Sequence, residues 1–207
     1  MYHLFVYTNT NLHNSPEMIE VLEIPDVRQR VAPITIERYH RMIDLGVFDD
    51  WNVELLNGVL VEKMSKSGLH VFLVDLLLEL TREFCSGADI WVRKEDPITI
   101  GDSEPEPDIS VVEGARIQYR RTKPTTAVFV IEVSITTVGV DRAKATAYAS
   151  AGIPEYWLIR PEDDLTEVYR VPIDGEYTEM TEVPSEATLE SSSLPGFSFN
   201  LADALAE

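Results

Sequence analysis

The sequence has one cysteine, few basic residues and no long apolar run, and each shortage argues against a class of protein. Cys85 has no second cysteine to pair with, which excludes a scaffold held together by internal disulfides. The longest apolar stretches, 71–80 and 127–133, fall far short of the roughly 20 residues that cross a bilayer. No basic leader precedes an apolar run at the start of the chain. We therefore expect a cytoplasmic protein without a membrane span.

Basic side chains are scarce, 17 Lys and Arg against 36 Asp and Glu, and the net charge is −19. Such a chain repels a polyanion at long range, so the composition alone counts against a nucleic-acid partner. Net charge does not describe local distribution, however. The basic residues at 116–123 could form a basic edge, or they could belong to an ordinary solvated loop. Divalent cations bound by the protein would offset part of the acidic field.

The length of 207 residues and the 44% hydrophobic content suit one substantial core. Residues 1–33 show no clear hydrophobic period and contain Pro16, Pro25 and Pro33, so we expect an N-terminal arm there. One domain is expected over residues 34–207.

Hydrophobic periodicity predicts the elements of that domain. Apolar residues at helical spacing predict helices at 35–46, 70–84, 140–151 and 201–205. Apolar and β-branched runs predict strands at 90–93, 98–100, 108–112, 127–133 and 156–159. Asn57-Gly58 and Asp174-Gly175 each predict a hairpin turn, because such turns need positive φ angles. This order indicates an α/β domain with a mixed central sheet flanked by helices and with additional β-hairpins.

Two acidic residues occupy positions where a carboxylate needs an explanation. Glu132 interrupts the apolar run 127–133, and an unpaired buried carboxylate there would be costly. Asp108 directly follows Pro107 and begins another apolar strand. The ends of strands in α/β sheets are common ligand sites, so the two acids could share a metal ion. An ordinary buried ion pair for Glu132 and a strand-start residue for Asp108 remain the alternatives.

Further candidates lie on the predicted helices and on the first hairpin. Asp141, Lys144 and Tyr148 share one helical stripe after the Glu132 strand, although a lysine on a helix is often a solvated surface group. Glu54 lies on a hairpin strand and His70 near a helix start, and both could be ordinary structural residues.

The ordered set of these motifs resembles the Uma-two family of endonucleases, which belongs to the restriction endonuclease-like PD-(D/E)XK superfamily. The resemblance covers roughly Ile34 to Leu205. It is carried by residues 53–58, 61–62, 64–65, 70, 105–109, 130–134, 141–142, 144, 148–149, 151–157 and 194–197.

The resemblance implies a divalent-metal-dependent endonuclease that hydrolyses phosphodiester bonds, with DNA expected rather than RNA. Asp108 and Glu132 would hold Mg²⁺ or Mn²⁺, with Glu54 as a further ligand, since hard oxygen ligands suit these ions. Position 134 is Ser where the superfamily has its catalytic lysine, and Lys144 is the substitute that the resemblance suggests. His70, Asp141 and Tyr148 would support these catalytic residues.

Two other functions are compatible with the same residues. The negative charge and the missing lysine at position 134 favour a binding or regulatory module that keeps the fold without catalysis. A metal hydrolase of a small phosphorylated substrate would need no basic track, but it would need a closed pocket. The sequence is also compatible with a homodimer.

Overall fold

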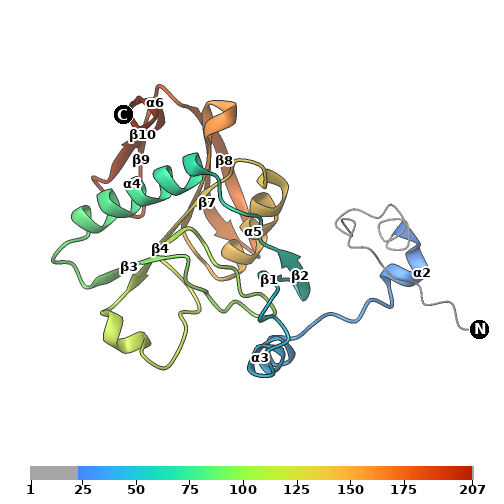
Figure 1. Cartoon of the computed structure of the whole chain (residues 1–207). Coiled ribbons are helices and arrows are strands. Elements are labelled where there is room, and N and C mark those ends of the chain that lie inside the picture. Colours follow the sequence, from blue (N-terminus) through green and yellow to red (C-terminus); the bar gives the residue numbers. More distant parts are fainter. Residues whose placement is uncertain (1–22, 207) are drawn as a thin grey trace, which may run out of the picture. The chain divides into compact units, whose positions relative to one another are not determined.

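The computed structural model describes residues 23–206, and the chain divides into two compact units, Met1–Pro33 and Ile34–Glu207. The predicted arm lies mostly outside the described residues. In its described part, the short helix α2 (Pro25–Arg28) begins after the extended residue Ile24 and has proline in its first turn. That position suits proline because the missing amide hydrogen has no partner in a helix there. The rest of this section concerns the second unit (Figure 1).

A six-stranded mixed sheet forms the centre of the second unit, in the order β3-β4-β5-β6-β7-β8. Its strands are β3 (Ile90–Lys94), β4 (Ile109–Glu113), β5 (Phe129–Val133), β6 (Glu155–Arg160), β7 (Leu165–Ile173) and β8 (Glu176–Pro184). All neighbours are antiparallel except β5 and β6, which are parallel. The predicted fold class is therefore confirmed.

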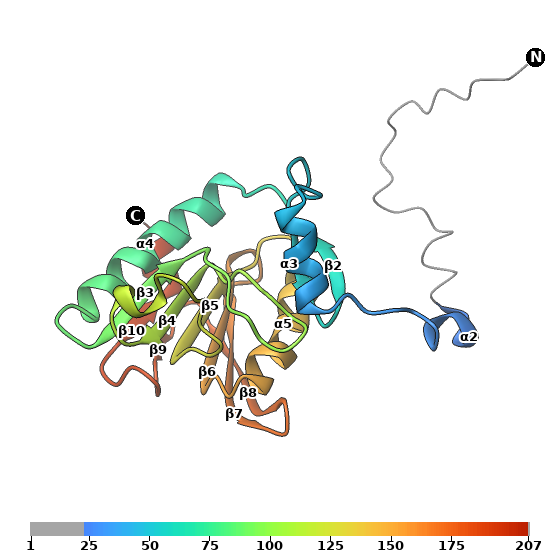
Figure 2. The same ribbon diagram turned by 90° about the horizontal axis from the view of Figure 1, so that it is seen from below.

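Two long helices cover opposite faces of this sheet (Figure 2). Helix α4 (Gly68–Phe84) begins at Ser67, whose side chain accepts a hydrogen bond from the amide of His70. Helix α5 (Val138–Ser150) is the crossover between the parallel strands β5 and β6. The crossover leaves the sheet where β5 ends and carries the chain back to the opposite end, where the parallel strand β6 begins, so the first turns of α5 lie near the end of β5. This geometry brings residues of α5 next to the end of the Glu132 strand.

A separate two-stranded hairpin, β1 (Val53–Leu56) and β2 (Val59–Glu62), follows helix α3 (Ile36–Asp44). Its turn is Asn57-Gly58, and both residues have positive φ, 48° and 77°. The hairpin is tied to the loop before β4, because the amide of Glu104 donates to the carbonyl of Leu55 at 2.7 Å. The predicted hairpin is thus observed, and it lies beside the segment that leads to Asp108.

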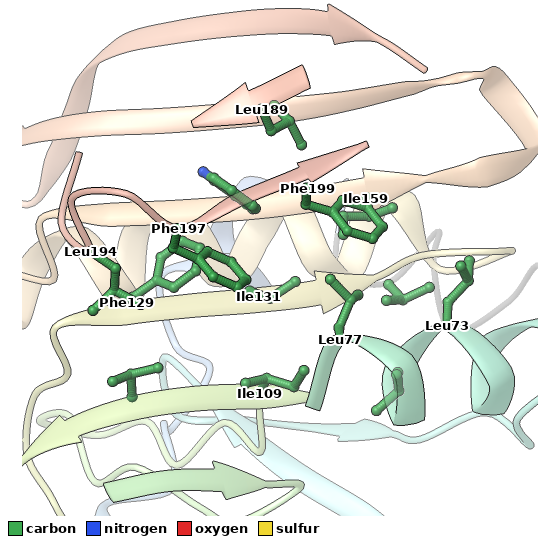
Figure 3. Packing of buried hydrophobic residues seen from close by; sticks show 14 of the residues in the cluster. Leu73, Leu77, Ile109, Phe129, Ile131, Ile159, Leu189, Leu194, Phe197 and Phe199 are labelled. Carbon is green, nitrogen blue, oxygen red and sulfur yellow. The ribbon is translucent and has the colours of Figure 1, made fainter. Parts of the chain in front are cut away.

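The core has two main clusters, one on each face of the sheet. Alternate residues of β4, β5 and β6 contribute to different clusters, as the two-residue period of a strand requires. The cluster under α4 includes Leu73, Leu77 and Phe129 (Figure 3). It also includes Trp157, whose ring meets that of Phe129 edge to face. The cluster under α5 contains Val130 and Tyr156 together with Tyr148 and Ile153, among others.

The C-terminal segment packs on the α4 side. It contains the short hairpin β9 (Thr188–Glu190) and β10 (Ser198–Asn200) and helix α6 (Leu201–Leu205). Leu194 and Phe197 are buried, and the Phe197 ring contacts Phe84, Phe129 and Trp157. Two 3-10 turns, η2 (Arg116–Tyr119) and η3 (Pro161–Asp163), complete the connections. Within the described part of the chain, every helix is too short or too polar to cross a membrane.

Two expectations need correction. Residues 98–100 were expected to form a strand, but they form only an isolated bridge at Ile100. The amides of Ile98 and Thr99 donate to the loop carbonyls of Pro105 and Pro124 instead. The segment is apolar because Ile98 and Ile100 are buried in the core cluster on the α5 side of the sheet. The second correction concerns the core, because one substantial core was expected and the sheet divides it into two main clusters.

Candidate active site

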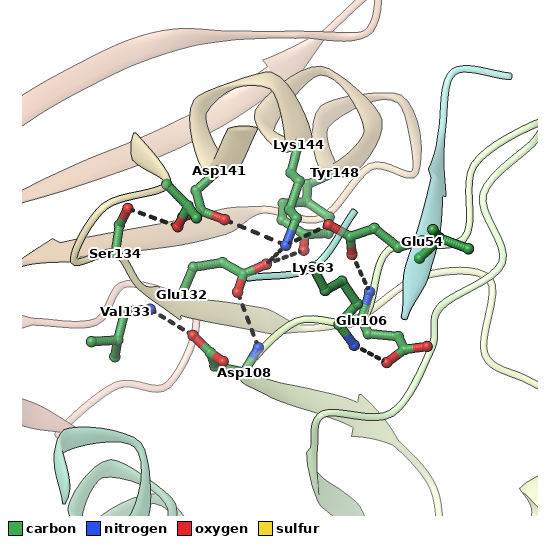
Figure 4. A network of polar contacts seen from close by, with 12 residues as sticks. Glu54, Lys63, Glu106, Asp108, Glu132, Val133, Ser134, Asp141, Lys144 and Tyr148 are labelled. Carbon is green, nitrogen blue, oxygen red and sulfur yellow. Dashed lines mark hydrogen bonds and ion pairs between the residues drawn. The ribbon is translucent and has the colours of Figure 1, made fainter. Parts of the chain in front are cut away.

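Asp108 and Glu132 meet because β4 and β5 are antiparallel neighbours. Ile109 faces Ile131 in the register, so the residue before β4 lies beside the penultimate residue of β5. The two acids also exchange hydrogen bonds with each other's backbone (Figure 4). The amide of Asp108 donates to Oε2 of Glu132 at 3.1 Å, and the amide of Val133 donates to Oδ2 of Asp108 at 2.8 Å. Their side chains are therefore fixed relative to one another.

Glu54 reaches the same place from the β1–β2 hairpin. It is buried, and its Oε2 accepts a hydrogen bond from the amide of Glu106 at 3.1 Å. Glu106 lies two residues before Asp108, so this bond joins the hairpin strand to the segment that carries Asp108. The hairpin and the central sheet thus contribute acids to one cluster.

The ammonium group of Lys144 lies among these acids. Its Nζ is 3.0 Å from Oε1 of Glu132, 3.1 Å from Oε1 of Glu54 and 3.4 Å from Oδ1 of Asp141. Asp141 is one turn earlier on α5 and also accepts a hydrogen bond from the hydroxyl of Thr137 at 2.6 Å. The helical stripe of Asp141, Lys144 and Tyr148 therefore faces the end of the sheet.

Tyr148 and His70 complete the set of residues named from the sequence. The hydroxyl of Tyr148 donates to Oε1 of Glu132 at 2.7 Å, and burial raises the pKa of Tyr148 well above its usual value. The Nε2 atom of His70, from the first turn of α4, lies 3.2 Å from Oδ2 of Asp108. The structure thus brings all seven residues together, and their chemical roles stay predictions.

Burial and mutual repulsion control the ionisation of this cluster. Burial lowers the pKa of Lys144, but the carboxylates of Glu132, Glu54 and Asp141 outweigh it and raise that pKa well above its usual value. Burial also raises the pKa of Glu132 strongly, and Lys144 offsets only part of this effect. Lys144 is therefore a cation at neutral pH, because the acids around it outnumber it.

The pKa of Asp108 shifts in the opposite direction to that of Glu132. Burial alone would raise its pKa, but the hydrogen bond and charge of His70, the amide of Val133 and the charge of Lys144 hold that pKa below the usual value. Asp108 and Glu132 are thus adjacent carboxyl groups with opposite shifts.

The cluster lies at the wall of a cleft of about 600 Å³. The cleft is lined by Glu54, His70, Asp108, Glu132, Asp141 and Lys144, together with residues 62–67, 106, 133, 135–137 and 139–140. Lys63 and Glu106 were missed by the sequence analysis, and their side chains form an ion pair in the cleft. The available signal was the position of Glu106 between two prolines just before Asp108.

The donor chemistry of the cleft fits an oxygen-preferring divalent cation. No group of three or more His, Cys, Asp or Glu side chains within residues 23–206 forms a ready-made metal cage. Mg²⁺ does not require one, because it keeps several waters and binds through one or two carboxylates. A carboxylate has about four lone-pair positions, so Asp108 and Glu132 retain acceptor capacity beyond the hydrogen bonds described above.

Comparisons with known proteins agree on the fold. A crystal structure described as "a putative nuclease belonging to DUF820 from Anabaena variabilis ATCC 29413" is similar, with a TM-score of 0.69 and 19% sequence identity. The similarity covers 84% of the present chain and 98% of that chain. A search of curated proteins gave no match.

The sequence model of the Uma2 family, described as "Putative restriction endonuclease", matches residues 36–202. That range includes every residue of the cluster and nearly the whole second unit. The chain therefore belongs to the Uma2 family, as its motifs indicated.

Proposed function

We propose that this protein is a divalent-metal-dependent endonuclease that hydrolyses phosphodiester bonds of DNA. One observation carries the proposal: the ammonium group of a buried lysine lies among acids of three elements at the wall of a cleft. Membership of a family described as restriction endonucleases supports nucleic acid as the substrate. An ordinary structural ion pair would not need a cleft of this size beside it.

Asp108 and Glu132 would hold Mg²⁺ or Mn²⁺ in this proposal, with Glu54 as a further ligand. When bound, such an ion lowers the pKa of an attacking water and offsets charge on the phosphate. Hydrolysis forms a bond from the water oxygen to phosphorus and breaks the bond from phosphorus to the leaving oxygen, which takes up a proton. The residues of the cleft would orient the phosphate for this in-line exchange.

Lys144 would stabilise charge on the phosphate oxygens rather than remove a proton from water. Its pKa is raised, so it has no tendency to act as a base at neutral pH. A positive charge held in a partly desolvated site is well suited to a developing oxyanion. Ser134 stands at the position of the superfamily lysine. It is buried, and its hydroxyl contacts the hydroxyl of Thr137 at 3.3 Å. A serine supplies no positive charge, so this position leaves the stabilisation of the phosphate to Lys144.

A metal hydrolase of a small phosphorylated substrate is the second candidate. The observation in its favour is the volume of the cleft, about 600 Å³, which lies within the usual range for small-molecule sites. Small phosphodiesters would then be cleaved and DNA would not.

The decisive experiment compares a variant in the cleft, just before β4, with a variant at the far end of β4. The parent protein is expected to cleave DNA in the presence of Mg²⁺ or Mn²⁺ and to stop when the metal is chelated. Asp108→Asn removes a carboxylate from the cleft and is expected to lose at least about 100-fold in rate, the scale of removing one main electrostatic group. Glu113→Gln changes an exposed acid at the other end of β4 and should cleave like the parent.

Equal cleavage by the parent and Asp108→Asn would show that the activity does not arise in this cleft. Absence of cleavage on single-stranded and duplex DNA and on RNA with either metal would contradict the nuclease proposal. Hydrolysis of a small aryl phosphodiester under those same conditions would then favour the second candidate, and binding without any hydrolysis would favour a binding module.

A further inference from the structure

Glu95 joins two lysines to the Asp108 segment. Its φ is 53°, in the left-handed region that a non-glycine residue seldom adopts, and its amide approaches the carbonyls of Pro107 and Asp108, both at 3.1 Å. Its two carboxylate oxygens face different lysines. Lys66 lies 2.7 Å from Oε2, and Lys94 lies 3.6 Å from Oε1. Glu95 therefore pairs with two ammonium groups through its side chain while its backbone is bonded to the segment that carries Asp108.

A third lysine, Lys63, contacts the same segment through Glu106. Lys63 follows β2, where its amide donates to the carbonyl of Asn52 at 2.9 Å, and its ammonium pairs with Glu106. Lys63 and Lys66 both line the cleft, and Lys94 is the last residue of β3, opposite Ile109. Three ammonium groups, those of Lys63, Lys66 and Lys94, thus border the segment that carries Asp108.

The acids that pair with these lysines are partly or largely exposed. The exposed fractions of the Glu106, Glu95 and Asp75 side chains are 28%, 34% and 59%. Partly exposed ion pairs of this kind contribute little to stability, so a phosphate can replace the carboxylate at little cost. Lys123 and Arg142 differ, because each pairs with a fully or almost fully buried acid, Glu104 or Glu167. If either cation moved away to bind a phosphate, its buried carboxylate would lose the compensating positive charge.

The most exposed basic cluster lies elsewhere. Arg116, Arg120 and Arg121 are exposed on and after η2. That turn follows β4, whereas Asp108 precedes β4, so the arginines come from the opposite end of the strand (Figure 1). These arginines would therefore not position a bound nucleic-acid strand at the cleft.

We infer that Lys63, Lys66 and Lys94 form a phosphate track that holds the nucleic-acid backbone across the Asp108 segment. The inference deepens the proposed function and rests on it, because it names the surface through which a protein of charge −19 binds a polyanion. The paired acids Glu106, Glu95 and Asp75 mask the track in the free protein. Substrate phosphates exchange with them, and each exchange releases counterions from the nucleic acid.

Salt dependence of binding tests this track. The probe is fluorescently labelled DNA, single-stranded and duplex, with Ca²⁺ as the divalent ion, and the dissociation constant is measured by anisotropy from about 50 to about 200 mM NaCl. The triple variant Lys63→Gln, Lys66→Gln, Lys94→Gln is expected to bind more weakly, and the slope of log affinity against log salt should fall by about one per lysine.

Two further variants separate local contacts from total charge. The variant Arg116→Gln, Arg120→Gln, Arg121→Gln removes the same amount of positive charge and should keep the parent slope. Glu95→Gln keeps the size of the side chain but removes the masking charge, so it should bind DNA more tightly than the parent. A purely structural role for the pairs of Glu95 predicts no such gain.

The inference would be overturned if the arginine variant lost the slope and the lysine variant kept it, while DNA was still cleaved by the parent. In that case the nuclease proposal would stand without the track. Absence of DNA binding by the parent, together with absence of cleavage, would overturn both.

Discussion

Lys144 is the residue on which the electrostatics of the cleft depend. Its ammonium lies within 3.4 Å of three carboxyl groups, and its side chain is only 7% exposed. Removal of one partner from a buried ionic group usually costs about 3 to 5 kcal/mol, because the remaining charges lose their compensation. The lysine thus stabilises the acids in the free protein, in addition to its proposed part in hydrolysis.

Lys144→Met should therefore affect both rate and stability. We expect DNA cleavage to be lost and the free energy of unfolding to fall by about 3 kcal/mol or more. Urea unfolding measures the second effect, and cleavage is measured at a temperature where the variant is still folded. The double variant Lys144→Met, Glu54→Gln removes one of the stranded acids, so it should lose less stability than the sum of the two single changes. It should remain inactive.

If the loss of stability in the double variant equalled the sum of the losses in the two single variants, the contact between Lys144 and Glu54 would be contradicted. Full activity of a folded Lys144→Met variant would contradict its role on the phosphate.

At the scale of elements, helix α5 is held in place from outside the cleft. Arg142, next to Asp141 on this helix, donates from Nε to both carboxylate oxygens of Glu167 on β7, at 3.1 Å each. The hydroxyl of Tyr156 on β6 donates to the carbonyl of Asp141 at 3.0 Å. These contacts orient α5 so that Lys144 points to the end of β5.

A second buried acid fastens the C-terminal segment. Glu155, at the start of β6, accepts hydrogen bonds at Oε2 from the hydroxyls of Ser191 and Ser192 and from the amide of Ser193. Its Oε1 accepts from Trp157 and Arg170. Burial would raise the pKa of Glu155, but these donors outweigh burial and lower it. A carboxyl group whose pKa is lower in the folded state stabilises the fold above its unfolded pKa, here near 4.5.

Glu155→Gln should consequently reduce stability at neutral pH by about 1 to 3 kcal/mol, the cost of impaired buried hydrogen bonds to a charged group. The difference from the parent should shrink as the pH falls below about 4.5 towards the folded pKa, because the parent then protonates Glu155. Urea unfolding at a series of pH values measures this. Glu190→Gln, an exposed change nearby, serves as the control, and a difference that grew on acidification would contradict the assignment.

Much of this architecture was accessible from the sequence, and the failures have physical causes. The Asn57-Gly58 turn, the buried strand around Glu132 and the helix after it are local patterns, and they were predicted correctly. The segment 98–100 was mistaken for a strand because burial in a packed loop and burial in a sheet give similar apolar runs. Lys63 and Glu106 were missed because their pairing depends on the placement of the hairpin against the sheet, which no local pattern encodes.

At the scale of the whole molecule, the net charge of −19 opposes compaction through self-repulsion. The candidate site concentrates part of that charge in one cleft. Any cation that binds only the folded cleft must therefore stabilise the fold by mass action.

We expect Mn²⁺ to raise the free energy of unfolding by about 2.7 kcal/mol at a concentration one hundred times its dissociation constant. Thermal or urea unfolding measures this gain, with NaCl at equal ionic strength as the control for general screening. Asp108→Asn should lose most of the gain. If NaCl alone gave the same gain, or if Asp108→Asn kept it, the cation would be acting on the surface charge and not on the cleft.

The position of Lys144 on the crossover helix also sets an order for synthesis. Glu54, Asp108 and Glu132 leave the ribosome before Lys144, because all three precede it in the chain. A nascent chain that ends at Val133 thus has these three acids without the cation that compensates them. We expect the three acids to converge stably only after α5 has been translated and has packed against the sheet, so this helix would complete the native cleft.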